Sequence, residues 1–147
     1  MAESYIFFNQ KLVITLERYK SVYDKLLNTD CIIEPLEDDV FRCNNMHFYE
    51  LNTNWCVGEN IEGNTYSIER LFDLAKDGEI IYLYFDEDLL DGELVVIREG
   101  KSVRKLFDYY STPELNENIG RLEYEETNKL ISWVDIASYS EYLFEHI

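Results

Sequence analysis

Apolar residues recur at helical spacing in residues 15–30, TLERYKSVYDKLLNTD. Thr15 is a suitable N-cap for a helix in this stretch. Its apolar stripe comprises Leu16, Tyr19, Tyr23 and Leu26, with Val22 and Leu27 beside it. The preceding runs at 5–8 and 11–14 are also apolar. They fit two short strands joined at Asn9-Gln10, and they equally fit an earlier start of the helix.

Two later stretches show the same periodicity. Residues 67–78 predict a helix with Ser67 as its N-cap and Gly78 at its C-terminal end. The apolar side of this helix comprises Ile68, Leu71, Phe72 and Ala75. Residues 130–146 predict a third helix that begins at about Asp135, which we expect to be its cap. Its buried stripe comprises Ile136, Tyr139 or Ser140, Leu143 and Ile147.

Short β-rich runs lie between the helices and predict strands. The first group occupies 31–35, 39–43, 46–51 and 55–58, and a loop is expected at 58–65. Longer runs follow at 79–85, 93–99 and 102–110, with a turn at Gly100-Lys101. The run at 79–85 is apolar on both faces, which is typical of a central strand. The polar stretch 111–129, which contains Pro113, predicts a loop.

These elements predict an α+β fold, in which two or three helices pack on an antiparallel β-sheet that includes a meander over 79–110. The length of 147 residues and the lack of a linker or repeat predict a single domain, 1–147. No apolar run approaches the roughly 20 residues that span a bilayer. The N-terminal stretch lacks the basic region and cleavage site of a secretory signal, so we expect a cytoplasmic protein.

The formal net charge of −17 narrows the choice of partners. Residues 1–30 are balanced, so the whole excess lies in residues 31–147, which hold nine basic and twenty-six acidic residues. Such an excess disfavours binding to nucleic acid and to anionic membranes, because both are polyanions. It favours a basic protein as the partner, and the alternative is that the acidity serves only solubility.

The connection between the first two strands of the meander, YFDEDLLDGE (84–93), concentrates five carboxylates. A calcium loop of the EF-hand type starting at Asp86 fails, because Leu90, Asp91 and Ile97 occupy three positions that need other residues. We therefore expect no tight metal site and no cofactor. Gly92 can serve the turn alone, which predicts that the five acids are surplus to folding.

Candidate nucleophiles give little support to catalysis. Cys31, Cys43 and Cys56 form no CxxC pair and are expected to be reduced and buried. Cys56 and His47 would be the obvious nucleophile and base, but no protease or transferase signature surrounds them. Acids crowded at a hairpin tip are usually solvated, so a catalytic carboxylate pair is not expected there. The chain is predicted not to be an enzyme.

Tyrosine packs well as a half-buried residue of sheets and helices, and it is also enriched at binding hot spots, so both interpretations can hold for different tyrosines. Acids at an interface rim speed association with a basic partner. The expected partner-binding residues are therefore the carboxylates and tyrosines of the meander: Asp86, Glu87, Asp88, Asp91, Glu93, Tyr84, Tyr109 and Tyr110.

The C-terminal half, from EIIYLYFDEDLLDGELVVIREGKSVRKLFDYY through GRLEYEETNKLISWVDIASYSEYLFEHI, resembles small immunity proteins of bacterial polymorphic-toxin and contact-dependent inhibition systems. The resemblance covers architecture and composition. It implies a non-enzymatic protein that binds one basic, nuclease-like cognate toxin and blocks it directly. Two alternatives remain: a DNA-mimic inhibitor of a DNA-binding protein, of the anti-restriction type, and a small enzyme with a carboxylate or metal site.

Overall fold

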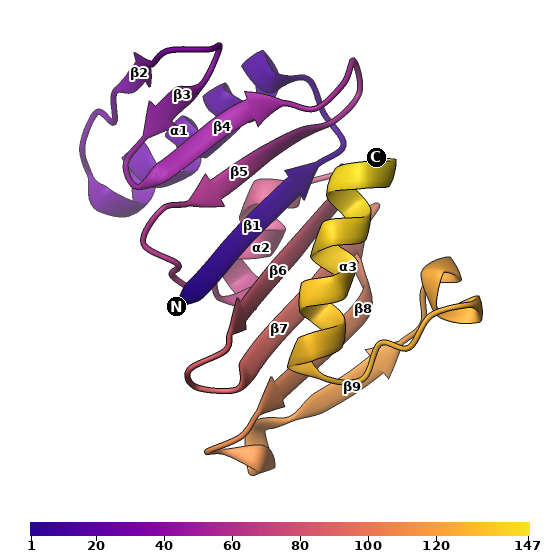
Figure 1. Ribbon diagram of the computed structural model, residues 1–147. Helices are drawn as coiled ribbons and strands as arrows, with labels where there is room; N and C mark the ends of the chain where they lie inside the picture. The colour runs from indigo at the N-terminus through magenta and orange to yellow at the C-terminus, as the bar shows by residue number, and fades with distance from the viewer.

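The computed structural model describes residues 1–147 and contains one nine-stranded antiparallel sheet with helices on both faces, which confirms the α+β prediction (Figure 1). The strand order is β2-β3-β4-β5-β1-β6-β7-β8-β9. The strands are β1 (Ala2–Phe8), β2 (Ile33–Pro35), β3 (Phe41–Cys43), β4 (Met46–Glu50), β5 (Cys56–Asn60), β6 (Ile80–Asp86), β7 (Asp91–Arg98), β8 (Lys101–Tyr109) and β9 (Glu117–Gly120). The helices are α1 (Leu12–Leu27), α2 (Ile68–Ala75) and α3 (Trp133–His146), with short 3-10 turns η1 (Pro113–Leu115) and η2 (Glu123–Glu126).

Strand β1 lies at the centre of the sheet, between β5 and β6 (Figure 1). Strands β2 to β5 form one antiparallel block and β6 to β9 form another, and β1 alone joins the two blocks. The ambiguous N-terminal runs are thereby assigned. Residues 5–8 belong to β1, whereas 11–14 fall at the start of α1.

The two faces of the sheet carry separate cores. Helices α1 and α2 cover one face, where Ile6, Phe48 and Tyr82 are buried. Helix α3 crosses the other face over the β6–β8 region, where Phe7 and Leu83 are buried (Figure 1). Because successive side chains of a strand point to opposite faces, a strand between two cores must be apolar at nearly every position. This requirement explains the continuous apolar runs of β1 and β6.

Helix α1 begins earlier than predicted, after Lys11, and Thr15 lies inside it rather than at its cap. The Thr15 hydroxyl donates to the Lys11 carbonyl (3.1 Å), one turn back. The predicted stripe is correct for Leu16 and Tyr19, but Leu26 and Leu27 are 48% and 53% exposed. These two side chains are exposed because the last turn of α1 is not covered by another element.

The caps of the other helices differ in detail from the sequence prediction. Ser67 caps α2 as expected, since its hydroxyl accepts from the Arg70 amide (3.2 Å). The residue with a positive φ at the end of α2 is Lys76 (φ 50°), not Gly78. Helix α3 starts at Trp133, and Asp135 lies in its first turn, where its carboxylate accepts from the Ser132 amide (3.1 Å).

The predicted loop at 111–129 contains a ninth strand, β9, which pairs with β8. This segment is anchored by Arg104, a strand residue that is only 1% exposed. Its guanidinium forms a salt bridge with Glu125 (2.6 Å) and donates to Asn118 Oδ1 (2.8 Å). It also donates to the Leu130 carbonyl (3.0 Å). The loop prediction was wrong for 117–120, because β9 is a mostly exposed edge strand whose polar residues show no apolar pattern.

Candidate protein-binding surface

The acidic connection forms the β6–β7 turn, as predicted, but its acids do different things. Asp86 is 8% exposed, and its Oδ1 accepts from the amides of Asp88 (2.9 Å) and Leu89 (3.3 Å). The left-handed position of the turn is taken by Leu90, at φ 58°. The carboxylate of Asp86 therefore builds the turn, and the expectation that it is surplus to folding was wrong.

Gly92 has a different role from the one predicted. It lies in β7, and a Cβ at this position would come within 2.8 Å of Trp133 Cα. The glycine lets the first turn of α3 approach the sheet closely. Asp108, which pairs with Gly92 in the sheet, accepts from the Trp133 amide (2.8 Å) and fixes the start of the helix.

Glu93 is held between two tyrosine hydroxyls. Tyr82 donates to its Oε1 (2.7 Å), and Tyr109 donates to its Oε2. Burial raises the pKa of the Glu93 carboxyl, and the two hydrogen bonds oppose this shift. Glu93 lies on the face that α1 and α2 cover, as does the buried Tyr84. Glu93 therefore joins β7 to β6 and β8, and little of its carboxylate is left for a partner.

The remaining predicted contact residues lie at or near the surface. Glu87 and Asp88 are exposed at the tip of the turn, and Asp88 pairs with the main-chain ammonium of Met1. Asp91 accepts from the Tyr110 amide (3.1 Å), and the Tyr110 ring is 73% exposed. Some of the predicted contact residues therefore lie at the surface, whereas Asp86, Glu93 and Tyr109 form hydrogen bonds that hold the turn and the strands together.

The strand register adds residues that the sequence did not suggest. Glu3 of β1 pairs with Phe85 of β6, and Tyr5 of β1 pairs with Glu59 of β5. Their side chains point to the face that carries α3, since they alternate with Ser4 and Ile6. The carboxylates of β1 and β5 therefore lie at the same end of the sheet as the β6–β7 turn.

A cleft of about 450 Å³ lies between β1, β5, the β6–β7 turn and the start of α3. We call it the acidic cleft. Its carboxylates are Glu3, Glu59 and Glu87, and its aromatic residues are Tyr5, Phe85 and Trp133. No lysine or arginine side chain lines it, and the cation at its wall is the main-chain ammonium of Met1, which pairs with Asp88. The Tyr5 hydroxyl donates to Glu3 Oε1 (2.7 Å), which orients that carboxylate at the cleft. A cleft of this volume accommodates a long side chain or a small molecule.

Only Glu87 of the predicted contact residues lines the acidic cleft. The others that line it come from positions far apart in the chain, and no local motif relates them. The central position of β1, which creates the cleft, was not evident from the sequence.

The remaining candidates can be placed. Cys31, Cys43 and Cys56 are free and buried, as predicted, and burial raises the pKa of both Cys43 and Cys56 to about 11. The Cys56 thiol lies 3.2 Å from the Thr15 hydroxyl on the α1 side of the sheet. His47 alternates with the buried Met46 and Phe48 and so points to the opposite face. Cys56 and His47 cannot act as a nucleophile and base.

Nowhere in the chain do three carboxyl, thiol or imidazole groups converge closely enough to hold a metal ion. None of the helices has the length and apolar character needed to cross a membrane. Comparisons with protein-family models, with curated proteins and with solved structures gave no match to this chain.

Proposed function

We propose that the chain is a non-enzymatic, immunity-type protein that neutralises a basic, nuclease-like toxin domain in the cytoplasm by direct binding. The acidic cleft is the observation that supports this most strongly. A lysine or arginine of the toxin would place its charge beside Glu3, Glu59 and Glu87. Its methylene groups and cation would lie against the aromatic side chains of the cleft.

Exposed apolar side chains from the same strand ends and turns favour a protein over a small cation as the ligand. Ile61 is 48% exposed, Leu89 54%, Val134 51% and Tyr110 73%. Ile61 lines the acidic cleft, Leu89 belongs to the β6–β7 turn, and Val134 lies in the first turn of α3. Protein interfaces combine an apolar, partly aromatic centre with a charged rim, and this end of the sheet offers both.

We expect the gene next to that of this chain to encode a basic toxin domain, and the test uses that domain. The chain should inhibit the nuclease activity of that domain at stoichiometric concentration, and titration calorimetry should give one saturable site. The triple variant Glu3→Gln, Glu59→Gln, Glu87→Gln should weaken binding by about tenfold or more, and its affinity should depend less on salt.

The matched control is Glu37→Gln, Asp38→Asn, Asp39→Asn, which removes the same charge from the exposed β2–β3 loop. Its affinity should stay within about twofold of the wild type, because these acids lie outside the acidic cleft. Undiminished nuclease activity in the presence of the wild-type chain contradicts the proposal. Equal losses in the two triple variants would mean that overall charge, not the cleft, governs binding.

A further inference from the structure

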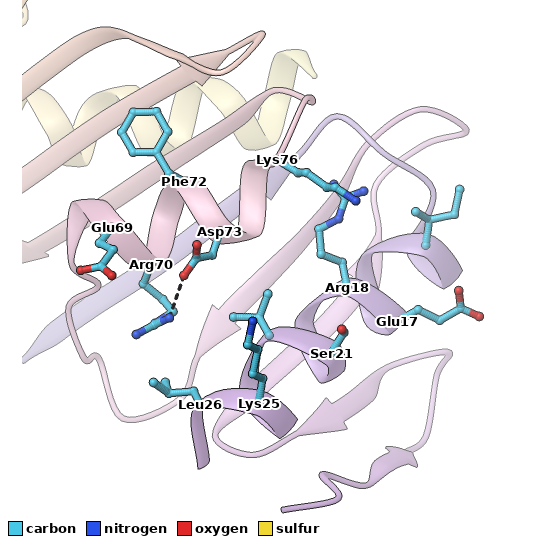
Figure 2. Close-up of a pocket in the computed structure, with 12 residues that line it drawn as sticks. Glu17, Arg18, Ser21, Lys25, Leu26, Glu69, Arg70, Phe72, Asp73 and Lys76 are labelled. Atoms are coloured by element: carbon cyan, nitrogen blue, oxygen red, sulfur yellow. Dashed lines mark hydrogen bonds and ion pairs between the residues drawn. The ribbon is translucent and has the colours of Figure 1, made fainter. Parts of the chain in front are cut away.

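Helices α1 and α2 lie side by side on the face of the sheet opposite α3, with an open groove of about 900 Å³ between them (Figure 2). One wall is a ridge of α1 residues spaced by four: Ile14, Arg18, Val22 and Leu26. The other wall comes from α2 and includes Arg70, Asp73 and Lys76. A ridge of residues spaced by four packs into the groove between two ridges of another helix, so a further helix can pack against this surface.

The groove differs in charge from the rest of the molecule. Four basic and three acidic residues line it, a formal charge of +1, which leaves nine basic and twenty-seven acidic residues elsewhere, a formal charge of −18. Arg70 pairs with Asp73 (2.8 Å). Lys25 and Lys76 pair with no carboxylate, and the one hydrogen bond of the Arg18 guanidinium goes to the Ala75 carbonyl (3.4 Å). Figure 2 shows Arg18, Lys25 and Lys76 reaching toward the space between the helices.

Seven of the thirteen basic side chains form no ion pair, and three of these seven, Arg18, Lys25 and Lys76, lie in this groove. Neighbouring carboxylates could have neutralised them, as Asp24 does for Lys20 on the same helix (2.8 Å). The Debye length is about 8 Å at physiological ionic strength, so an approaching anionic group senses these cations more than the distant acidic end of the sheet.

The α1 ridge also exposes apolar surface. Ile14 is 43% exposed and Leu26 48%. These two residues are twelve positions apart, or about 18 Å along the helix axis. That distance equals the length of roughly three helical turns of a partner, which is enough for the i, i+4, i+7 and i+11 anchors of helix-in-groove recognition.

We propose that the α1–α2 groove binds an acidic amphipathic helix of a protein partner. The apolar side of that helix packs between Ile14, Val22 and Leu26, and its carboxylates pair with Arg18, Lys25 and Lys76. The occupant has the opposite charge to the partner of the acidic cleft, and the two surfaces lie on opposite faces of the sheet. The chain can therefore hold two different partners at once.

The experiment measures fluorescence anisotropy of a labelled synthetic peptide of about 15 residues, with leucines at i, i+4, i+7 and i+11 and glutamates on the flanks. A peptide of the same composition in scrambled order is the first control. The wild-type chain should bind the amphipathic peptide saturably and the scrambled one at least about tenfold more weakly, at a salt concentration near 0.15 M.

The test variant is Lys25→Glu, Lys76→Glu, and its matched control is Lys101→Glu, Lys129→Glu, which reverses two exposed lysines elsewhere. The test variant should lose about tenfold or more in affinity, whereas the control should stay within about twofold. Circular dichroism of both variants confirms that they are folded.

Binding that never saturates up to about 1 mM peptide overturns the proposal. Equal affinity for the scrambled peptide, or equal losses in both lysine variants, overturns it as well. Analytical sedimentation of the wild-type chain tests whether the groove binds a second copy of the same chain. Self-association that Lys25→Glu, Lys76→Glu abolishes would make the groove an interface between two copies and would also overturn the proposal.

Discussion

At the scale of single residues, polar side chains inside the molecule do structural work that apolar side chains do elsewhere. Arg104 joins β8 to the segment that contains β9 and η2, and Glu93 joins β7 to β6 and β8 through two tyrosines. Both residues are charged in the sequence and look like surface positions there. Their roles depend on partners that only the tertiary structure supplies.

Replacing Arg104 by alanine should destabilise the protein by about 3–5 kcal/mol, because the Glu125 carboxylate is left buried and unpaired. Urea unfolding at neutral pH measures this. The comparison variant is Arg98→Ala, which breaks the more exposed pair with Glu79 (2.7 Å) and should cost less than about 1 kcal/mol. Similar losses in the two variants would show that the Arg104 network adds little.

Glu93 predicts a specific pH dependence. Burial raises the pKa of its carboxyl above the ordinary value of 4.5, so the folded state binds this proton more tightly than the unfolded state. The contribution of Glu93 to stability is therefore fully present below the unfolded pKa and is lost as the pH rises through the folded pKa. Between pH 4.5 and pH 7 the wild type should lose stability relative to Glu93→Gln, which cannot titrate.

Unfolding in urea at several pH values, at constant ionic strength, gives this difference directly. The control is Glu114→Gln, an exposed acid, whose stability relative to the wild type should change little over the same range. A stability difference between wild type and Glu93→Gln that stays constant with pH would contradict the raised pKa.

At the scale of elements, the sequence predicted the helices and strands that are marked by a pattern of neighbouring residues. The β6–β7–β8 meander and α2 with its Ser67 cap follow from apolar runs and a capping hydroxyl, and both are confirmed. The failures have tertiary causes. Strand β9 is stabilised by the buried guanidinium of Arg104, and α1 exposes Leu26 because nothing covers its last turn. Neither cause leaves a periodic pattern in the sequence.

The turn between β6 and β7 depends on the side chain of Asp86. Asp86→Ala removes the acceptor for two main-chain amides and should cost about 1–2 kcal/mol, whereas Glu87→Ala at the exposed tip should stay within about 0.5 kcal/mol. Thermal unfolding followed by circular dichroism distinguishes them. Were the two variants equally stable, the turn would be specified by its backbone alone.

At the scale of the whole molecule, the candidate site could not be predicted from the sequence as a set. The sequence showed the excess of acidic residues and predicted the β6–β7 turn correctly, and Glu87 of that turn was among the predicted contact residues. It did not identify Glu3, Tyr5, Glu59 or Trp133, because these come together only when β1 inserts between β5 and β6. The sequence shows which residue types a surface can contain, but the topology of the sheet decides which residues lie together on that surface.

The net charge of −17 makes stability depend on salt. Raising the ionic strength from about 0.01 M to about 0.15 M shortens the Debye length from roughly 30 Å to roughly 8 Å and screens repulsion among the acids. The Tm measured by scanning calorimetry should rise over this range. Glu37→Gln, Asp38→Asn, Asp39→Asn should show a smaller rise, and sucrose of equal osmolality serves as the neutral control. A Tm that does not rise with salt would mean that ion pairs offset the repulsion.

The central position of β1 has a consequence for synthesis. The ribosome makes β1 before the other strands of the sheet, but the second neighbour of β1, β6, ends at Asp86, 78 residues after Phe8. At a translation rate of about 5–20 residues per second, roughly 4–16 s pass between the synthesis of β1 and that of β6. During that interval an apolar strand has at least one unpaired edge, which is the kind of segment that chaperones hold and that aggregates. The nascent chain therefore remains vulnerable until β6 has emerged, and the sheet cannot be completed around β1 before then.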